Sequence, residues 1–184
     1  MEIGEYYISC QFKNCDDNFI WVFSGTYGPI SNSGREALWS DIGDIRGLWN
    51  DPWCISRDFN VVRLPKERRN CLRMSLAMRR FSEVIDKLQL RDLPLTGGSF
   101  TWCGRFLVSE DWESHFCGLF QCLLPKPTSD HALILLDGGG ITGRKTPLHS
   151  ENMWLKVEGF TDLSGIGGWA IISGDPAVIF LLVN

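Results

Sequence analysis

Residues 52–62 have the sequence PWCISRDFNVV, and this stretch decides the fold. Apolar residues lead into it and out of it, which is typical of a buried strand that enters the core. Asp58 and Asn60 place a carboxylate and an amide near its end. Because strand side chains alternate between two faces, we expect these two to point the same way. On spacing alone, a strand that ends in polar turn residues is the simpler interpretation.

The segments around this strand predict a mixed chain of strands and helices. Residues 5–12 and 18–27 are rich in β-forming side chains and flank a turn-forming KNCDD, so they predict an antiparallel hairpin. A helix is expected within 31–49, with Ser33 and Glu36 as a capping box. The remaining predicted elements are a helix over 75–90, strands over 99–104, 105–109 and 131–137, and a helical turn over 110–116.

The composition is that of an ordinary folded protein. The chain has 184 residues, 44% of them hydrophobic and 22% charged, which suits one domain with a real core. Eight Trp residues argue against disorder. The net charge of −4 gives the whole molecule no attraction to nucleic acid, so any such attraction requires a local basic patch.

The cysteines and the chain ends give expectations about the compartment. None of the seven cysteines forms a C-x-x-C pair, which disfavours zinc, and the odd number disfavours a full disulfide framework. We expect mostly buried free thiols in a reducing compartment. No signal peptide is evident, and the apolar run AVIFLLV is too short to span a bilayer. We therefore expect an intracellular protein of the nucleus or cytoplasm, with no membrane partner.

A second polar pair precedes the apolar run HALILLD. Asp130 and His131 stand directly before this predicted strand. A histidine beside an aspartate can serve as a base or as a hydrogen-bond donor to phosphate near neutral pH. Taken alone, the pair is more simply explained as a loop that caps a strand. Together with Asp58 and Asn60 it makes a coherent set for phosphodiester hydrolysis.

Four motifs in order resemble a known group of enzymes. The chain is similar to the endonuclease/exonuclease/phosphatase superfamily, whose members have the DNase I-like fold. The text between the motifs is closest to the endonuclease domain of plant LINE-type non-LTR retrotransposons, from about residue 5 to about residue 160. The motifs are TYGP at 26–29, DFN at 58–60, TGGSFTW at 96–102 and SDH at 129–131.

The resemblance implies a fold class and a domain division. The expected class is α/β (α+β), a DNase I-like four-layer sandwich of two mostly antiparallel sheets flanked by helices. The N-terminal strands of that fold are expected to be missing, which leaves an exposed sheet edge and predicts low solubility. Residues 1–157 are expected to form the partial endonuclease/exonuclease/phosphatase domain, and residues 158–184 a divergent C-terminal tail.

The resemblance also implies a role for each motif residue. Asp58 and Asp130 would bind or position Mg²⁺ and the attacking water. Asn60 would orient the nucleophile and the scissile phosphate, and Tyr27 would contact that phosphate. His131 would donate a hydrogen bond to the phosphate or act as the base. The implied activity is Mg²⁺-dependent nicking of DNA that primes reverse transcription.

Several positions depart from the family pattern. The upstream strand with the metal-binding Glu has no counterpart here, and Gly104 stands where relatives carry the Asp that orients the catalytic His. Arg57 replaces a Gly, and Ile30 replaces an Asn that is common in relatives. Trp102 is expected to be structural or to line the DNA-facing side. We therefore expect an impaired or inactive nuclease.

Two further functions stay open from the sequence. One is a non-catalytic remnant with at most weak binding of nucleic acid. The other is a phosphatase or phosphodiesterase of the same superfamily that acts on a small molecule. The LINE-like connecting text favours DNA as the partner, and no obligate protein partner is evident.

A basic stretch follows the predicted strand. It is equally compatible with a patch that binds the DNA backbone and with a solvated loop and helix face. The residues proposed to bind DNA are Arg63, Lys66, Arg68, Arg69 and Arg73.

Overall fold

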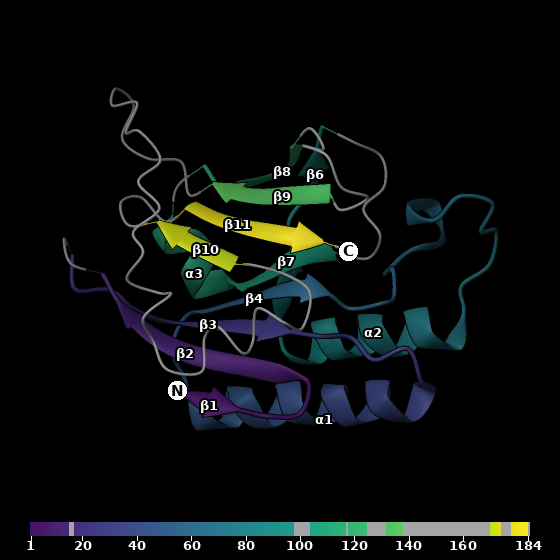
Figure 1. Cartoon of the computed structure of the whole chain (residues 1–184), viewed down its shortest axis with the longest axis horizontal. Coiled ribbons are helices and arrows are strands. Elements are labelled where there is room, and N and C mark those ends of the chain that lie inside the picture. The colour runs from purple at the N-terminus through teal and green to yellow at the C-terminus, as the bar shows by residue number, and fades with distance from the viewer. Residues whose placement is uncertain are drawn as a thin grey trace.

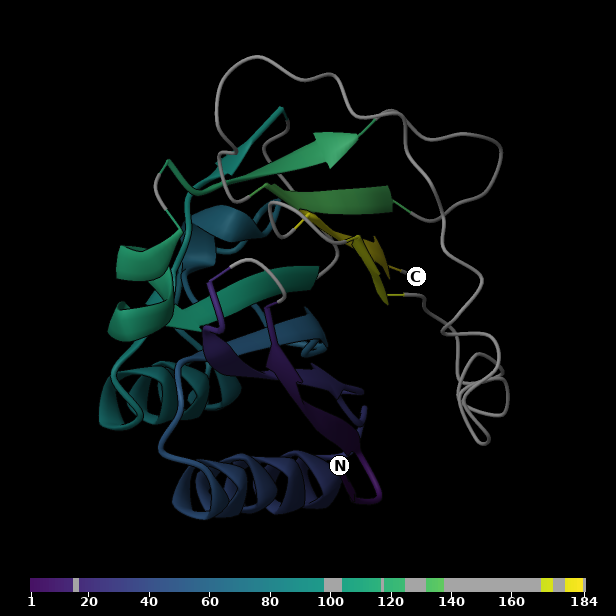
Figure 2. The same cartoon turned by 90° about the vertical axis from the view of Figure 1, so that its left-hand side faces the viewer.

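Two β-sheets pack face to face, and two long helices cover the outer face of the first sheet (Figures 1 and 2). The structure is a computed structural model. It describes residues 1–14, 17–97, 104–116, 118–124, 132–137, 170–173 and 178–183. At residues 57, 58, 124, 132 and 133, and throughout 170–173 and 178–183, it describes the main chain alone.

The first sheet contains the strand that opened the sequence analysis. It is antiparallel except where β3 lies parallel to β4. The predicted hairpin is confirmed, because β2 and β3 pair along their whole length. In spatial order the strands are β1 (Glu2–Ile3), β2 (Tyr7–Lys13), β3 (Ile20–Thr26), β4 (Trp53–Asp58), β7 (Gly104–Ser109) and β5 (Leu90–Asp92).

The second sheet combines the middle of the chain with its end. Among its described strands, only β6 and β8 are parallel. The segment that the sequence sets apart as a tail supplies two of the strands, and β11 pairs with β9 from end to end. In spatial order the strands are β10 (Ala170–Ser173), β11 (Val178–Val183), β9 (Ala132–Asp137), β8 (Phe120–Leu124) and β6 (Leu95–Thr96).

Helix α1 (Asn32–Leu48) joins the two parallel strands β3 and β4. Its cap corrects the sequence prediction, because Ser31 and not Ser33 accepts the hydrogen bond of a first-turn amide, that of Gly34 at 3.1 Å. A Cβ on Gly34 would lie 2.7 Å from the Cβ of Pro29. The glycine therefore lets the preceding loop close onto the first turn, which moves the start of the helix toward Ser31.

The other helices agree with the sequence prediction, except that α2 (Leu76–Lys87) stops at Lys87 and Leu90, predicted as helical, begins β5. Helix α2 begins at the predicted Ser75, whose hydroxyl accepts from the Met78 amide at 3.2 Å. The sulfur of Met78 accepts from the Ser75 amide in return, at 3.4 Å. Helix α3 (Glu110–His115) follows β7, and a short 3₁₀ turn η1 (Pro65–Glu67) precedes α2. None of the helices in the described residues is both long and apolar enough to cross a membrane.

An aromatic cluster forms the core between the helices and the first sheet. The Phe81 ring of α2 lies 5.2 Å from the Trp39 ring of α1 and 4.9 Å from the Phe59 ring (centroid distances). All three side chains are buried. Phe59 directly follows β4, so the cluster fixes the point at which that strand leaves the sheet.

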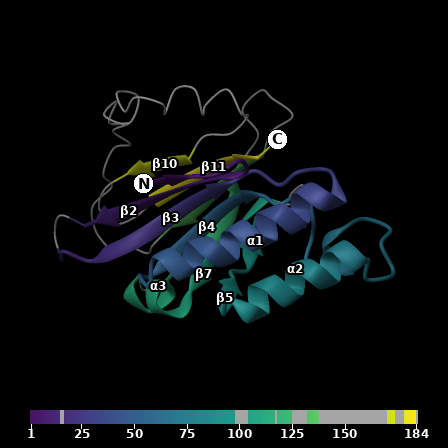
Figure 3. The same cartoon turned by 90° about the horizontal axis from the view of Figure 1, so that it is seen from below.

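A second core lies between the two sheets. Phe106 of β7 and Ile134 of β9 are completely buried there, together with Trp112 of α3. Trp21 of β3 packs against Trp112, with 5.8 Å between the ring centroids. The general α+β class with two mostly antiparallel sheets is therefore confirmed. In the described residues, α1 and α2 lie on the first sheet (Figure 3).

The described cysteines carry no disulfide. Cys54 is buried in the sheet–sheet core, and Cys10, Cys71 and Cys122 are half-buried. Burial raises the pKa of the Cys54 thiol well above its usual value. Such a thiol is an unreactive apolar side chain at neutral pH.

Candidate active site

The carboxyl ends of β3 and β4 lie side by side at one edge of the first sheet. Gly25 is paired with Ser56 in the parallel register, so the two strands end together. The chain then leaves β3 into the motif at residues 26–29 and leaves β4 into the motif at residues 58–60. The carboxyl edge of parallel strands is where α/β proteins commonly build their sites. Two of the four sequence motifs are thus neighbours in the fold.

Asn60 is held in a turn and not in a strand. β4 ends at Asp58, and Asn60 has a left-handed backbone with φ of 49°. The alternation of strand side chains therefore does not relate Asp58 to Asn60. The expectation that both point to the same face of a strand does not apply. Instead the Asn60 side-chain amide donates a hydrogen bond to the Gly28 carbonyl. Asparagine tolerates this conformation better than most residues.

Arg35 ties both motif loops to the first turn of α1. Its guanidinium donates to the Ile30 carbonyl at 2.8 Å and to the Asn60 carbonyl at 3.3 Å. It also donates to the Asn32 side chain at 3.0 Å. This residue was missed from the sequence, where it is one of several arginines with no motif around it. Its role depends on the helix start lying between two loops, which is a tertiary feature.

Tyr27 lies at the surface of the same edge. Its amide donates to the Tyr6 carbonyl at 2.7 Å, which joins the loop after β3 to the turn before β2. The residue is 37% exposed. It therefore lies at the surface of this edge, as a contact to phosphate requires.

The strand opposite Asp58 begins at the same edge. Gly104 of β7 is paired with Asp58, and Arg57 is paired with Arg105. The glycine that replaces the expected His-orienting Asp is thus a direct main-chain neighbour of the predicted metal ligand. Like charges directly opposite on paired strands are unfavourable unless they are neutralised, so the surroundings of Arg105 matter.

The other predicted site residues lie outside the described residues. These are Trp102, Asp130 and His131. The strand β9, which follows them in sequence, begins at Ala132. In Figure 1, the arrows of β9 and β4 point in opposite directions, so β9 begins at the end of the molecule where β4 stops. The convergence of Asp58, Asn60 and His131 stays a prediction.

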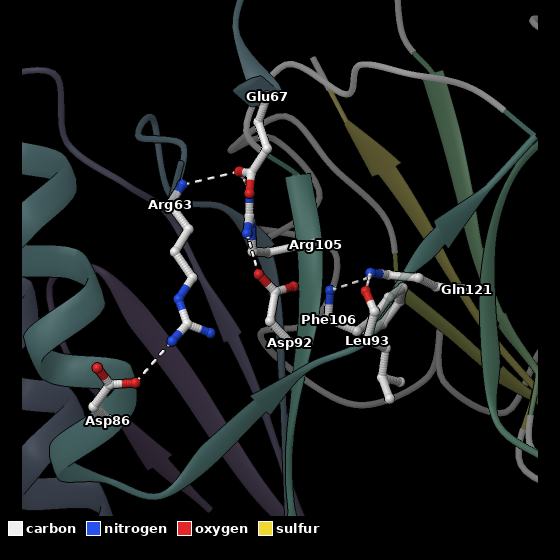
Figure 4. A network of polar contacts seen from close by, with 8 residues as sticks. All are labelled: Arg63, Glu67, Asp86, Asp92, Leu93, Arg105, Phe106 and Gln121. Atoms are coloured by element: carbon white, nitrogen blue, oxygen red, sulfur yellow. Dashed lines mark hydrogen bonds and ion pairs between the residues drawn. The ribbon is translucent and has the colours of Figure 1, made fainter. Parts of the chain in front are cut away.

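An ion-pair network surrounds Arg105 of β7, which is paired with Arg57 near the end of β4 (Figure 4). Arg105 is 9% exposed and binds the Glu67 carboxylate at 2.6 Å and the Asp92 carboxylate on its other side. Burial acts to lower the pKa of Arg105, but the two carboxylates outweigh it and raise that pKa, so the guanidinium stays charged. Burial raises the pKa of Asp92. The signal in the sequence was the lone arginine in the otherwise apolar run GRFLV.

Glu67 also fixes the start of the basic stretch. Its carboxylate accepts from the Arg63 amide at 3.0 Å, and the Arg63 guanidinium binds Asp86 of α2 at 2.7 Å. Arg63, predicted to bind DNA, is therefore engaged with the protein itself. The other predicted DNA-binding residues are exposed, namely Lys66, Arg68, Arg69 and Arg73.

A metal site requires several ligand side chains close together. The described side chains contain no group of three or more His, Cys, Asp or Glu able to hold a metal ion. This finding does not include the two ligands that the resemblance implies for Mg²⁺. Only the main chain of Asp58 is described, and Asp130 is outside the described residues. Mg²⁺ binding at Asp58 and Asp130 therefore stays a prediction.

Comparison with known proteins gives no family. No protein-family model matches the chain, and none of the curated proteins is similar to it.

Proposed function

We propose that this chain derives from a Mg²⁺-dependent DNA endonuclease of the DNase I-like, LINE-type kind, and that phosphodiester hydrolysis in this copy is impaired. One observation carries the proposal. The Asn60 side chain of the DFN motif is bonded to the Gly28 carbonyl of the TYGP motif. Motifs that are 29 or more residues apart in the sequence therefore meet at one edge, as a shared site requires.

The architecture supports the DNase I-like fold. Two facing, mostly antiparallel sheets enclose one core, and helices on the outer face of the first sheet enclose another. The start of β9 at the same end of the molecule as the end of β4 supports a site shared by the DFN and SDH motifs. Of the four layers expected, the described residues account for one helical layer and both sheets.

The chemistry proposed for the edge is in-line attack of water on a phosphodiester. The water oxygen bonds to phosphorus, the bond to the leaving oxygen breaks, and that oxygen takes up a proton. Bound Mg²⁺ would supply neutralisation of phosphate charge. Asn60, held by Gly28 and Arg35, would orient the phosphate, and the exposed Tyr27 would contact it.

Impairment is supported by the partner of Asp58 in the register. Gly104 gives no carboxylate at the position paired with Asp58. Loss of the carboxylate that orients a catalytic His costs about 10⁴-fold in kcat in a well-studied hydrolase. This observation also favours the second candidate, a non-catalytic remnant that binds nucleic acid through its exposed arginines.

Nicking of supercoiled plasmid with Mg²⁺ tests the proposal. We expect slow nicking that EDTA stops, and that Asn60→Ala and His131→Ala each reduce by about 10²-fold, the usual contribution of such groups. The matched control is Asn50→Ala, an exposed residue after the end of α1, which should nick at the wild-type rate. Equal background nicking in all four proteins would defeat the nuclease and leave the remnant.

A further inference from the structure

The connection between β4 and α2 carries cations that the protein itself does not neutralise. Four of its exposed cations make no ion pair with a residue that the structure describes. They are Lys66, Arg68, Arg69 and Arg73. Glu67 is the one acidic residue between positions 61 and 82, and Arg105 binds its carboxylate. This part of a chain with a net charge of −4 is therefore basic.

Exposed apolar side chains lie among these cations. Leu72 is 95% exposed, and Met74 and Leu76 are exposed as well. A single exposed leucine needs no explanation, but three large apolar residues within five positions are typical of a surface that meets a partner. We name the four cations and these three apolar residues the basic face.

Carboxylates of α1 and of the N-terminal segment gather around Tyr7. Burial, and then Asp41, Glu2 and Asp44, raise the pKa of the Tyr7 phenol. Burial, and then Asp44 and Glu5, raise the pKa of the Asp41 carboxyl. The four carboxylates are therefore close enough to act on their neighbours. In the described part of the chain none of the four has an ion-pair partner.

Apolar side chains are exposed beside these carboxylates too. Met1 and Ile3 flank Glu2 in the sequence, and both are exposed. Leu48 is exposed one turn after Asp44, so the two lie on the same face of α1. We name the four carboxylates and these three apolar residues the acidic face. It has the same mixture of side chains as the basic face, with the opposite charge.

The two faces lie too far apart to neutralise each other within one molecule. In Figures 1 and 3 the connection extends beyond the first turn of α1, and α1 runs from there toward the N-terminus. Asp44 lies roughly 18 Å along the helix from its first residue, at about 1.5 Å per residue. The Debye length at physiological salt is about 8 Å, so these charges are screened from each other. A second copy of the chain can supply what each face lacks.

We propose that copies of this chain associate head to tail, with the basic face of one molecule on the acidic face of the next. The cations pair with the carboxylates, and the apolar residues of the two faces bury one another. Because the two faces differ, the contact is heterologous and repeats from copy to copy. It uses side chains and not strand pairing, so salt reverses it. The association holds whether or not the chain hydrolyses phosphodiesters.

The salt dependence of the molecular mass tests the contact. Sedimentation velocity of the full chain is compared in about 0.01 M and about 1 M salt, where the Debye length is about 30 Å and about 3 Å. At low salt we expect the weight-average mass to rise at least about twofold with protein concentration, since the contact continues beyond a dimer. At high salt we expect a monomer. A monomer in both buffers would overturn the proposal.

Neutralising the basic face should leave a monomer at low salt. The variant is Arg68→Gln combined with Arg69→Gln, two exposed residues. The matched control is Lys13→Gln combined with Lys87→Gln, which changes the net charge equally outside both faces and should associate as wild type does. Association of the arginine variant at the wild-type level would overturn the role of the connection.

Neutralising the acidic face should have the same effect. The variant is Glu2→Gln combined with Asp44→Asn, and its matched control is Glu83→Gln combined with Asp111→Asn, all of them exposed residues. We expect a monomer from the first and wild-type association from the second. The opposite result would show that the basic face meets a different surface.

A mixture of the two neutralised variants distinguishes a head-to-tail contact from other forms of association. Each variant keeps one intact face, so the mixture should form a one-to-one dimer and nothing larger. A mixture that stays monomeric would overturn the proposal. Association of wild type that disappears after nuclease digestion of the sample would also overturn it, in favour of nucleic acid that bridges the molecules.

The apolar part of the contact is tested at Leu72. Leu72→Ala should weaken association at low salt about tenfold, because less apolar surface is buried. Ile20→Ala, an exposed apolar residue of β3 outside both faces, is the control and should leave association unchanged. Equal association of wild type and the Leu72 variant would remove the apolar contact from the proposal. None of these measurements depends on nicking, so their failure is separate from failure of the proposed function.

Discussion

The turn after β4 and the connection that follows it differ in where their polar groups find partners. In the turn, the Asn60 side chain bonds to Gly28 and its carbonyl accepts from Arg35. In the connection, Arg68 and Arg73 extend into solvent from an anchored backbone. Two adjacent segments of one chain thus serve different purposes. The first holds its geometry by internal hydrogen bonds, and the second leaves its charges exposed to solvent.

The largest expected effect on stability concerns Phe59, the apolar residue that anchors the turn after β4 in the core. Phe59→Ala should cost about 3–5 kcal/mol of unfolding free energy, because its completely buried ring packs on Trp39 and Phe81. Leu72→Ala in the connection should change it by less than about 0.5 kcal/mol. Urea unfolding of both variants measures the difference. Similar losses would contradict the division between a packed turn and a presented loop.

The next effect is expected at the ion pair between Arg105 and Glu67, which joins the connection to the sheet. Arg105→Met should cost about 3 kcal/mol, at the low end for broken buried pairs because Glu67 stays partly exposed. Arg91→Met is the control, since its pairs with Glu110 and Glu113 are half exposed and worth about 0–1 kcal/mol. Thermal unfolding of both variants measures the costs. Equal costs would remove Arg105 as the anchor of the basic connection.

A smaller change sharpens the part played by Arg35. Arg35→Ala should cost about 1–3 kcal/mol, because two carbonyls of the motif loops lose a charged donor. Hydrogen exchange of the amides at 59–61 should accelerate by more than tenfold. Arg80→Ala is the matched control, because its 3.8 Å contact with Glu36 is exposed. Unchanged exchange in the Arg35 variant would show that the turn holds itself.

The smallest expected effect concerns acid stability far from the site. The Phe19 amide, and then His115 among other groups, lower the pKa of Asp17 below its usual value. A lowered folded-state pKa gives stability that is present above the unfolded pKa of about 3.9 and lost as pH falls through the folded pKa. Asp17→Asn should flatten the pH dependence of urea midpoints below about pH 4. A steeper dependence would reverse the sign.

Strong periodic patterns made much of the fold predictable. The hairpin of β2 and β3, helix α2 and the run that became β9 all carry enough β-forming or amphipathic residues to be recognised alone. The short strands β5 and β6 were missed, because two or three residues become a strand only when a neighbour supplies the ladder. β8 was missed because Gln121 interrupts its apolar run.

The candidate site was predictable only where residues belong to a motif. Tyr27 and Asn60 were found by motif order, but the bond from Asn60 to Gly28 requires a left-handed turn that strand alternation does not foresee. Arg35 and Arg105 act across long sequence separations, so their neighbours cannot be inferred locally. The same limit applies to the cap of α1, where Ser31 rather than Ser33 accepts the Gly34 amide and Pro29 lies close to Gly34.

The outermost strands of the two sheets have a consequence for how copies of this chain meet. Among the residues that the structure describes, β1 and β6 have two residues each, β5 has three and β10 has four. A neighbouring molecule that tried to extend either sheet would find room for only a few rungs of main-chain hydrogen bonds. Short edge strands are one way in which proteins avoid edge-to-edge association of their β-sheets. We therefore expect aggregation of this protein to begin from partly unfolded molecules and not from folded ones.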